Sequence, residues 1–273
     1  MLPSAARAVL QAAEVDGIPM LLARLPGPFR VAFTTRHGGA SSGSYGSLNL
    51  GVHTTDSEDA VAWNRLALGA ALGRLVGAEA PELVSPRQVH GTRVTGTAEY
   101  RAEVGGEDPF GERSGCDGLT LRPLLDDGLA SLLLFADCVP VVLASEVDVA
   151  VAHGGWRGLL GGVVQQAARA MTAPPGLAVI GPSIGPCCYR VAPDLAADFE
   201  RRYGPGVTRD GDRLDLWEVA ARALEEVEVP RSRVTNPRLC TACHPELFFS
   251  RRREGPDTGR HGAVAWLAPG EET

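Results

Sequence analysis

The stretch that most constrains the fold runs from Ala130 to Gly162, where apolar runs alternate with polar clusters. Three runs are of strand length and rich in branched side chains, which predicts buried strands. They are residues 132–135, 139–144 and 147–152. Polar clusters at 136–138 and 153–158 stand at the ends of these runs. Because a rigid sheet can direct side chains at its strand ends into a cleft, this stretch predicts a functional site.

The rest of the chain mixes strand and helix signals without strict alternation, which indicates a single α+β (mixed α/β) domain over residues 28–268. Further strands are expected at 29–35, 83–88, 177–180 and from 234. Helices are expected from a cap at Asp56 or Ser57 to about residue 75, and at 159–171, 192–202 and 216–226. Residues 1–27 are predicted to be a helical or loosely ordered lead-in, and residues 98–118 to be a loop.

Composition excludes several kinds of chemistry. The chain has 273 residues and a formal net charge of −7, so we expect no broad basic surface for nucleic acid. All 26 basic residues are arginines, which excludes a phosphate-loop lysine, a Schiff-base lysine and an anchor for pyridoxal phosphate. We find no secretory signal and no membrane span, and therefore expect a cytoplasmic protein with no membrane partner. The six cysteines are then expected to be thiols, metal ligands or core residues.

Three residues with metal-binding side chains follow predicted strands: His90, Cys138 and His153. Glycine or proline follows each of them within four residues, which lets backbone and ligand approach closely. Two imidazoles and a thiolate would form a three-ligand zinc site with an open fourth position, the arrangement of catalytic rather than structural zinc. Zinc bound in this way lowers the pKa of a water ligand to about 7.

The same residues allow two other interpretations. All three could be buried core residues without a metal, because they are widely separated in the sequence. Alternatively, Cys138 could be the nucleophile of a cysteine hydrolase and His153 its base. The metal content of the protein distinguishes these interpretations.

Several arginines could hold a phosphate group through paired hydrogen bonds. Arg157 is favoured, because it lies in a glycine-rich turn that leads into a predicted helix whose first amides can also bind an anion. Arg36 is a weaker candidate, and Arg251–Arg253 are more typical of solvated surface charges.

Residues 240–244 match the Cys-x-x-Cys-His pattern of attached haem c. Haem attachment normally takes place outside the cytoplasm, where we do not expect this chain. A structural pair of thiols or a chance match is therefore the expected meaning of Cys240, Cys243 and His244.

Taken together, these motifs resemble those of one bacterial family. Its members were first labelled multicopper polyphenol oxidases, or laccase-domain proteins, and later recognised as purine nucleoside phosphorylases that also deaminate adenosine. One branch has been called peptidoglycan editing factor. The matching segments follow the order of the family over about residues 28–262. They are residues 33–39, 47–51, 64–65, 88–91, 117–118, 136–140, 152–158, 181–189, 240–241, 249–253 and 259–260.

The resemblance implies a monomeric four-layer α/β/β/α sandwich, with zinc held by His90, Cys138 and His153. We expect Asp137 to transfer protons during deamination and Arg157, helped by Arg36, to hold phosphate. The complete set of expected site residues adds the catalytic Cys138 and the substrate-binding Arg36, Asn49 and Gln88. The chain departs from the family at Arg251, where tyrosine is usual.

The histidine content argues against a laccase-type oxidase. Such an enzyme needs a blue copper site and a trinuclear cluster with many further histidines, whereas this chain has six histidines and no His-x-His pair. Copper in one His₂Cys pocket would support only incidental polyphenol oxidation. We predict a zinc-dependent purine nucleoside phosphorylase that takes phosphate with adenosine, inosine or methylthioadenosine and also deaminates adenosine. The alternatives are a cysteine or metal amidohydrolase that edits a peptidoglycan precursor and a nucleoside-sensing binding protein.

Overall fold

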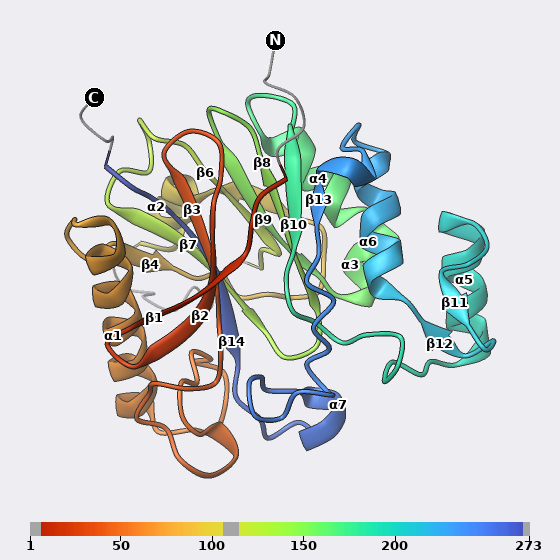
Figure 1. The fold of residues 1–273 in the computed structure, drawn as a ribbon, viewed down its shortest axis with the longest axis horizontal. Coiled ribbons are helices and arrows are strands. Elements are labelled where there is room, and N and C mark those ends of the chain that lie inside the picture. Colours follow the sequence, from red (N-terminus) through yellow and green to blue (C-terminus); the bar gives the residue numbers. More distant parts are fainter. Residues whose placement is uncertain (1–6, 106–114, 270–273) are drawn as a thin grey trace.

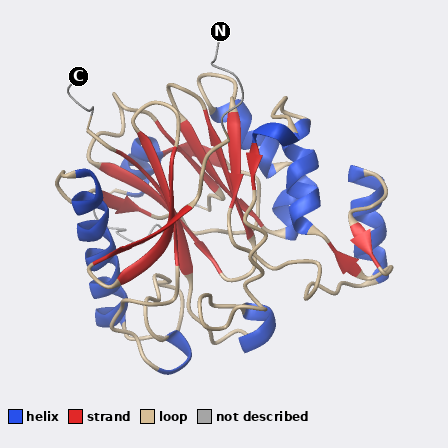
Figure 2. Ribbon diagram, in the orientation of Figure 1, coloured by secondary structure: helices blue, strands red, loops and turns tan. Residues whose placement is uncertain are grey.

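The computed structural model describes residues 7–105 and 115–269, and within these ranges it contains two six-stranded sheets (Figures 1 and 2). The first sheet has the strand order β1-β2-β3-β14-β7-β4. These strands are β1 (Gln11–Val15), β2 (Ile18–Arg24), β3 (Phe29–Thr34), β14 (His261–Leu267), β7 (Leu129–Phe135) and β4 (Glu82–Val84). Its neighbours pair antiparallel except for β4, which runs parallel to β7.

The second sheet has the strand order β13-β10-β8-β9-β6-β5. These strands are β13 (Val234–Thr235), β10 (Leu177–Ile180), β8 (Val139–Ala144), β9 (Val149–Gly154), β6 (Gly118–Leu121) and β5 (Val94–Gly96). The predicted central runs are therefore β7, β8 and β9, and β7 belongs to one sheet while β8 and β9 belong to the other. The polar cluster between β7 and β8 consequently lies where the chain crosses between the sheets.

Three separate hydrophobic cores define four layers. Helix α1 packs on the first sheet, and Leu68 of the helix and Trp266 of β14 belong to the same buried cluster. The inner faces of the two sheets enclose a second core, in which Phe33 and Val151 take part. The third core lies between the second sheet and its helices (Figure 1). The covering helices are α1 (Glu58–Val76), α3 (Trp156–Gly161), α4 (Val163–Ala170) and α6 (Leu216–Glu225). This arrangement confirms the predicted α/β/β/α sandwich.

Burial on both faces explains why the central strands are continuously apolar. In β8, Val139, Val141 and Leu143 contribute to the core under the helices. The alternate residues Val142 and Ala144 contribute to the core between the sheets. Because successive side chains of a strand point to opposite faces, a strand covered on both sides needs an apolar residue at every position.

The helix expected after residues 56–57 is confirmed as α1. The hydroxyl of Ser57 accepts a hydrogen bond from the Ala60 amide and caps the first turn, a contact that contributes about 1 kcal/mol in helices of this kind. Gly77 ends the helix in the left-handed conformation at φ 65°, which a residue without a side chain adopts without strain.

The prediction of a helical or loosely ordered lead-in over residues 1–27 is wrong for the described part, because β1 and β2 form a hairpin there. Val15 pairs with Ile18 across a two-residue turn. Asp16 and Gly17 both have positive φ, 53° and 76°. Asp-Gly is the preferred sequence for such a turn, so the signal was present in the sequence.

Two further predictions need correction. Residues 98–118 are not all loop, since α2 (Thr97–Val104) begins there, and residues 106–114 lie outside the described residues. The helix expected at 159–171 is divided into α3 and α4 by Gly162, which has φ 88°. The remaining helices in the described ranges are α5 (Pro193–Tyr203) and the short α7 (Arg251–Glu254).

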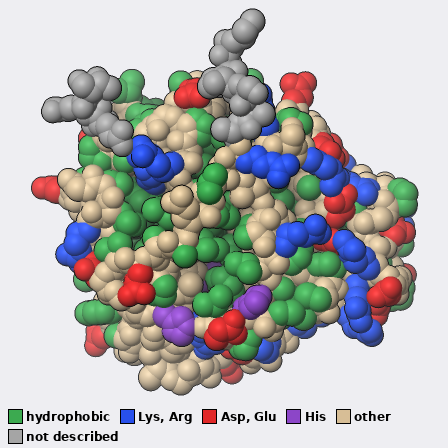
Figure 3. All heavy atoms as spheres, viewed as in Figure 1, with side chains coloured by type: hydrophobic (Ala, Val, Ile, Leu, Met, Phe, Trp, Pro, Cys, Tyr) green, Lys and Arg blue, Asp and Glu red, His purple; other side chains and the backbone are tan. Residues whose placement is uncertain are grey.

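Charged side chains of both signs are interspersed over the face drawn in Figure 3. Several arginines on this protein are paired with carboxylates, as Arg231 is with Glu218 and Glu225. Within the described residues, the longest helices lack the length and apolar character that crossing a bilayer requires.

Candidate metal centre

The side chains of His90, Cys138 and His153 converge, although they come from three different segments. His90 follows β4, Cys138 stands between β7 and β8, and His153 lies within β9. Their ligand atoms all lie within 4.8 Å of one another, and the Cys138 Sγ is 3.9 Å from the His90 Nε2. Ligands of one tetrahedral zinc lie about 3.3–3.8 Å apart. The observed separations are slightly larger, so the three residues are close enough to bind a single ion after a small shift, and three ligands leave a fourth position for another.

The buried carboxylate of Asp117 holds two of the three ligands in place. Its Oδ1 lies 2.8 Å from the His153 Nδ1 and accepts the His90 backbone amide at 2.9 Å. Its Oδ2 accepts the amides of Val89 and Gly91 at 3.2 and 2.7 Å. A carboxylate on Nδ1 fixes the tautomer that leaves Nε2 free for a metal. Asp117 is thus a positioning residue for this centre.

The backbone at His90 is held in an uncommon conformation. His90 has φ 60°, in the left-handed region that residues with a side chain seldom adopt. The three consecutive amides of residues 89–91 all donate to Asp117. These hydrogen bonds offset the cost of the conformation and keep the imidazole directed at Cys138.

The charges of the centre favour the form of cysteine that binds metals. Burial would raise the pKa of Cys138, but the neighbouring His153 and His90 lower it to about 6. Burial would lower the pKa of His153, but Cys138 and Asp117 raise it to about 9. Burial would also raise the pKa of Asp117, whereas the hydrogen bond and charge of His153 hold it below its ordinary value. The two histidines therefore favour the thiolate form of Cys138.

A cavity of about 680 Å³ opens onto these ligands. Of the other predicted site residues, Gln88, Asp137 and Arg157 line it, whereas Arg36 and Asn49 are not among its wall residues. The wall also contains residues for which the sequence suggested no specific role, and these include Trp156, Tyr189 and Arg260. Arg251 and Arg252 line the cavity as well, although Arg251–Arg253 were expected to be solvated surface charges.

The predicted residues on the cavity wall differ in how many of their polar groups are already bound within the protein. The Gln88 amide is bound to the Leu134 backbone, donating at 2.9 Å and accepting at 2.7 Å. The Asp137 carboxylate accepts the Thr241 hydroxyl at 2.7 Å and the Arg252 amide at 2.6 Å. Arg157 stacks on the Trp156 ring at 4.3 Å and forms no ion pair with the described carboxylates. Of these three side chains, Arg157 is the most available to a ligand.

The two predicted residues away from the wall bind other parts of the chain. Arg36 pairs with Glu254 at 2.8 Å and donates to the backbone of Gly46. Asn49 is fully buried, and its Oδ1 accepts the amides of Gly51 and Arg260 at 3.0 and 2.9 Å. Because Gly51 and Arg260 line the cavity, Asn49 supports the wall from behind.

These features define a class: a mixed α/β sandwich with a His₂Cys candidate metal centre in the wall of a cavity that arginines also line. The chain belongs to the family described as multi-copper polyphenol oxidoreductase laccase, whose model matches residues 30–268. This confirms the resemblance seen in the sequence motifs.

Several relatives of known structure or name resemble the chain over most of its length. A protein of Geobacillus stearothermophilus named purine nucleoside phosphorylase YlmD is 35% identical over 88% of this chain and 89% of the relative. Purine nucleoside phosphorylase YfiH of Escherichia coli is 32% identical over 91% of this chain and 98% of the relative. The crystal structure of the Geobacillus YlmD superposes on this structure with a TM-score of 0.79. The superposition covers 96% of this chain and 100% of the Geobacillus chain.

Proposed function

We propose that the protein is a zinc-dependent purine nucleoside phosphorylase that also deaminates adenosine. The observation that carries the proposal is the shared cavity, in which a His₂Cys ligand set lies beside arginines that form no ion pair with the described carboxylates. The relatives named purine nucleoside phosphorylase support the choice of nucleoside and phosphate as substrates.

The arginines supply the charge that phosphorolysis needs. Arg157 and Arg251 both line the cavity, and neither forms an ion pair with the described residues. Guanidinium groups bind phosphate through paired hydrogen bonds. A phosphate held there attacks C1′ of the ribose, the bond from C1′ to the base nitrogen breaks, and the purine leaves with a proton. The products are ribose 1-phosphate and the free base.

Proton transfer is assigned to Asp137. Among the described residues that line the cavity it is the one carboxylate, and it stands next to Cys138. A carboxylate can accept about four hydrogen bonds, and Asp137 accepts two from the protein, which leaves lone pairs for a substrate proton. Zinc held by His90, Cys138 and His153 would supply a Lewis acid and a water of lowered pKa for deamination.

Zinc is proposed over copper because an open three-ligand site of imidazole and thiolate is typical of catalytic zinc. Copper binds such ligands more tightly than most divalent ions, so a copper-loaded fraction would account for incidental oxidation of polyphenols. Metal analysis of protein expressed without added copper decides between them.

The decisive experiment incubates the purified protein with adenosine and inorganic phosphate and separates the products. Adenine with ribose 1-phosphate indicates phosphorolysis, and inosine or hypoxanthine indicates deamination. Arg157→Ala should raise the KM for phosphate at least tenfold, whereas the control Arg201→Ala, on α5 and paired with Asp198, should not. An unchanged KM in Arg157→Ala would exclude it as a phosphate ligand.

The thiolate of Cys138 next to a protonated His153 favours a second candidate, a cysteine amidohydrolase acting on a peptidoglycan precursor. Such an enzyme would release an amino acid from a nucleotide-linked muramyl peptide, would be inactivated by a thiol alkylating agent, and would be indifferent to chelators. Loss of activity on zinc removal and its return on adding zinc would exclude this candidate.

A further inference from the structure

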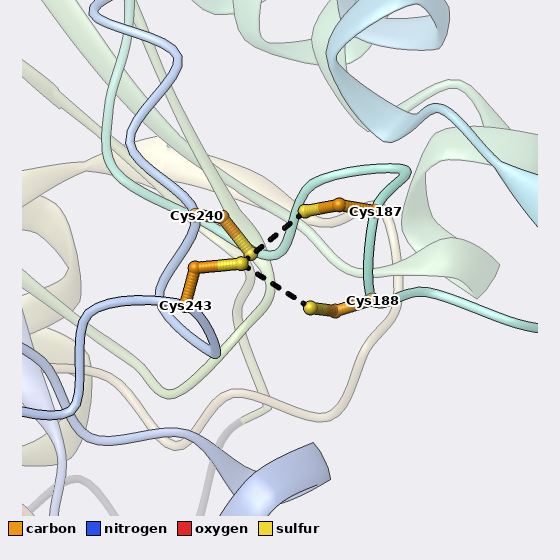
Figure 4. A group of neighbouring side chains, drawn as sticks. All are labelled: Cys187, Cys188, Cys240 and Cys243. Atoms are coloured by element: carbon orange, nitrogen blue, oxygen red, sulfur yellow. Dashed lines mark hydrogen bonds between the residues drawn. The ribbon is translucent and has the colours of Figure 1, made fainter.

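A second group of metal-binding side chains lies outside the cavity. Cys187 and Cys188 follow the turn after β10, and Cys240 and Cys243 follow β13 (Figure 4). All four sulfur atoms lie within 4.8 Å of one another. The Cys243 Sγ is 3.5 Å from that of Cys187 and 3.4 Å from that of Cys188. Figure 4 shows the four side chains pointing toward one another from two separate loops.

The spacing of these sulfurs fits one small ion. A disulfide requires sulfurs about 2.05 Å apart, and all four cysteines are free. A tetrahedral ion with bonds of about 2.3 Å places its four sulfurs about 3.8 Å apart, close to the separations observed. Without a cation, ionised sulfurs at this spacing would repel one another.

The backbone holds both loops before any ion binds. Ser183 and Cys240 form a parallel bridge, with the Thr241 amide donating to the Ser183 carbonyl at 3.1 Å. The Gly185 amide donates to the Cys240 sulfur at 3.2 Å, a contact of the kind that orients thiolate ligands. The Cys243 amide donates to the Cys240 carbonyl at 3.1 Å and closes the Cys-x-x-Cys turn. The site is therefore pre-organised.

We infer that Cys187, Cys188, Cys240 and Cys243 bind one structural zinc ion through four thiolates. Binding exchanges the four thiol protons, which pass to solvent, for the metal. A closed set of four sulfurs has no open position, so this zinc is structural. This inference explains the Cys-x-x-Cys-His motif. Its two cysteines form half of the ligand set, whereas His244 is not a ligand and contacts Glu246.

The zinc would join a loop that lines the cavity to a loop that holds one of the wall residues. Cys188 is followed by Tyr189, which lines the cavity. Cys240 is followed by Thr241, whose hydroxyl binds the Asp137 carboxylate at 2.7 Å. The four-cysteine centre therefore supports the wall on which Cys138 depends, without contacting it.

The test measures zinc per chain in the full-length protein, purified with reductant and without chelator. Wild-type protein should carry about one zinc more than the Cys187→Ser/Cys243→Ser double variant. Cys116→Ala, a cysteine outside both centres, should keep the wild-type content, and Cys138→Ala should lose only the zinc of the cavity. Made in the Cys138→Ala background, where the cavity zinc is already lost, the double substitution should still remove one zinc, so the result is independent of the proposed function.

Two further measurements keep the test decisive if the double variant folds poorly. Cys187→Ala should lose one zinc, and Cys187→His should restore it, because imidazole replaces thiolate as a zinc ligand. Cobalt-loaded protein should show sulfur-to-cobalt charge-transfer absorption that weakens in Cys187→Ala. Equal zinc in wild type and double variant, iron in place of zinc, or a pair of these thiols oxidised to a disulfide in anaerobically purified protein would each overturn the inference.

Discussion

Replacing Asp117 by asparagine should separate metal binding from folding at the candidate centre. The substitution keeps the shape of the side chain but removes its charge and one of its two acceptor oxygens. The carboxylate now receives three backbone amides and contacts the His153 Nδ1. An asparagine places an NH₂ group where one carboxylate oxygen now accepts hydrogen bonds. Because that group cannot accept them, at least one of these backbone hydrogen bonds must be lost.

The expected magnitudes follow from these contacts. A buried amide left without an acceptor costs about 1–3 kcal/mol, so Asp117→Asn should lower the free energy of unfolding by roughly 2–4 kcal/mol. Carboxylates that orient a metal-bound histidine change metal affinity by about 10–100-fold when removed. We therefore expect zinc at the His90, Cys138 and His153 centre to bind at least tenfold more weakly.

The assay combines urea unfolding with zinc competition against a chromophoric chelator. Asp126→Asn is the matched control, because Asp126 is also fully buried and also accepts two backbone amides, those of Ala98 and Arg122. Asp126→Asn should destabilise the protein by a similar amount and leave zinc affinity unchanged. Wild-type zinc affinity in Asp117→Asn, or equal loss in both variants, would refute a positioning role for Asp117.

Two further predictions concern buried polar side chains. Burial, with Arg260 and Arg36 nearby and Glu254 opposing them, lowers the pKa of His261 to about 3. Its unfolded form therefore takes up a proton first as pH falls below about 6.5, and stability should fall by up to about 4 kcal/mol toward pH 3. His261→Leu should reduce this acid sensitivity in urea titrations, the exposed His37→Leu should not, and equal slopes would contradict the assignment. Asn49→Ala strips acceptors from the amides of Gly51 and Arg260. It should cost roughly 2–5 kcal/mol of unfolding free energy and raise the KM for substrate; wild-type stability would show that Asn49 does not support the wall.

The sequence predicts the central strands and the convergence of His90, Cys138 and His153 for one physical reason. Strands buried on both faces must be apolar throughout, as β8 and β9 are, so polar residues such as Cys138 and His153 stand out at their ends. Elements with weaker local signals were missed. The Asp16-Gly17 turn follows β1, the largely exposed strand at the edge of the first sheet, where the pattern of burial is weak.

Contacts between distant segments were not predictable from local patterns. Asp117 acquires its role because three amides near His90 reach it across 26–28 residues of sequence. The four cysteines meet only because the chain after β10 pairs with the chain after β13 at Ser183 and Cys240. Arg251, the first residue of α7, lines the cavity, although Arg251–Arg253 have the composition of a solvated surface.

The two centres are connected through Asp137, and this connection can be measured. Asp137 has φ 96°, outside the usual range for a residue with a side chain, and directly precedes Cys138. Its carboxylate is held by the hydroxyl of Thr241, next to Cys240. Losing the zinc of the four-cysteine centre should therefore loosen Cys138 through Thr241 and weaken zinc binding in the cavity.

A double-mutant cycle with Cys187→Ala and Thr241→Val tests this connection. Thr241→Val removes the hydroxyl that binds Asp137 but no sulfur ligand, so it should weaken zinc in the cavity severalfold and leave the four-cysteine zinc in place. If Thr241 transmits the effect of the second centre, Cys187→Ala should weaken cavity zinc less in the Thr241→Val background than in wild type. Additive losses would mean that the two centres stabilise the same wall independently, with Asp137 responding only to its own hydrogen bonds.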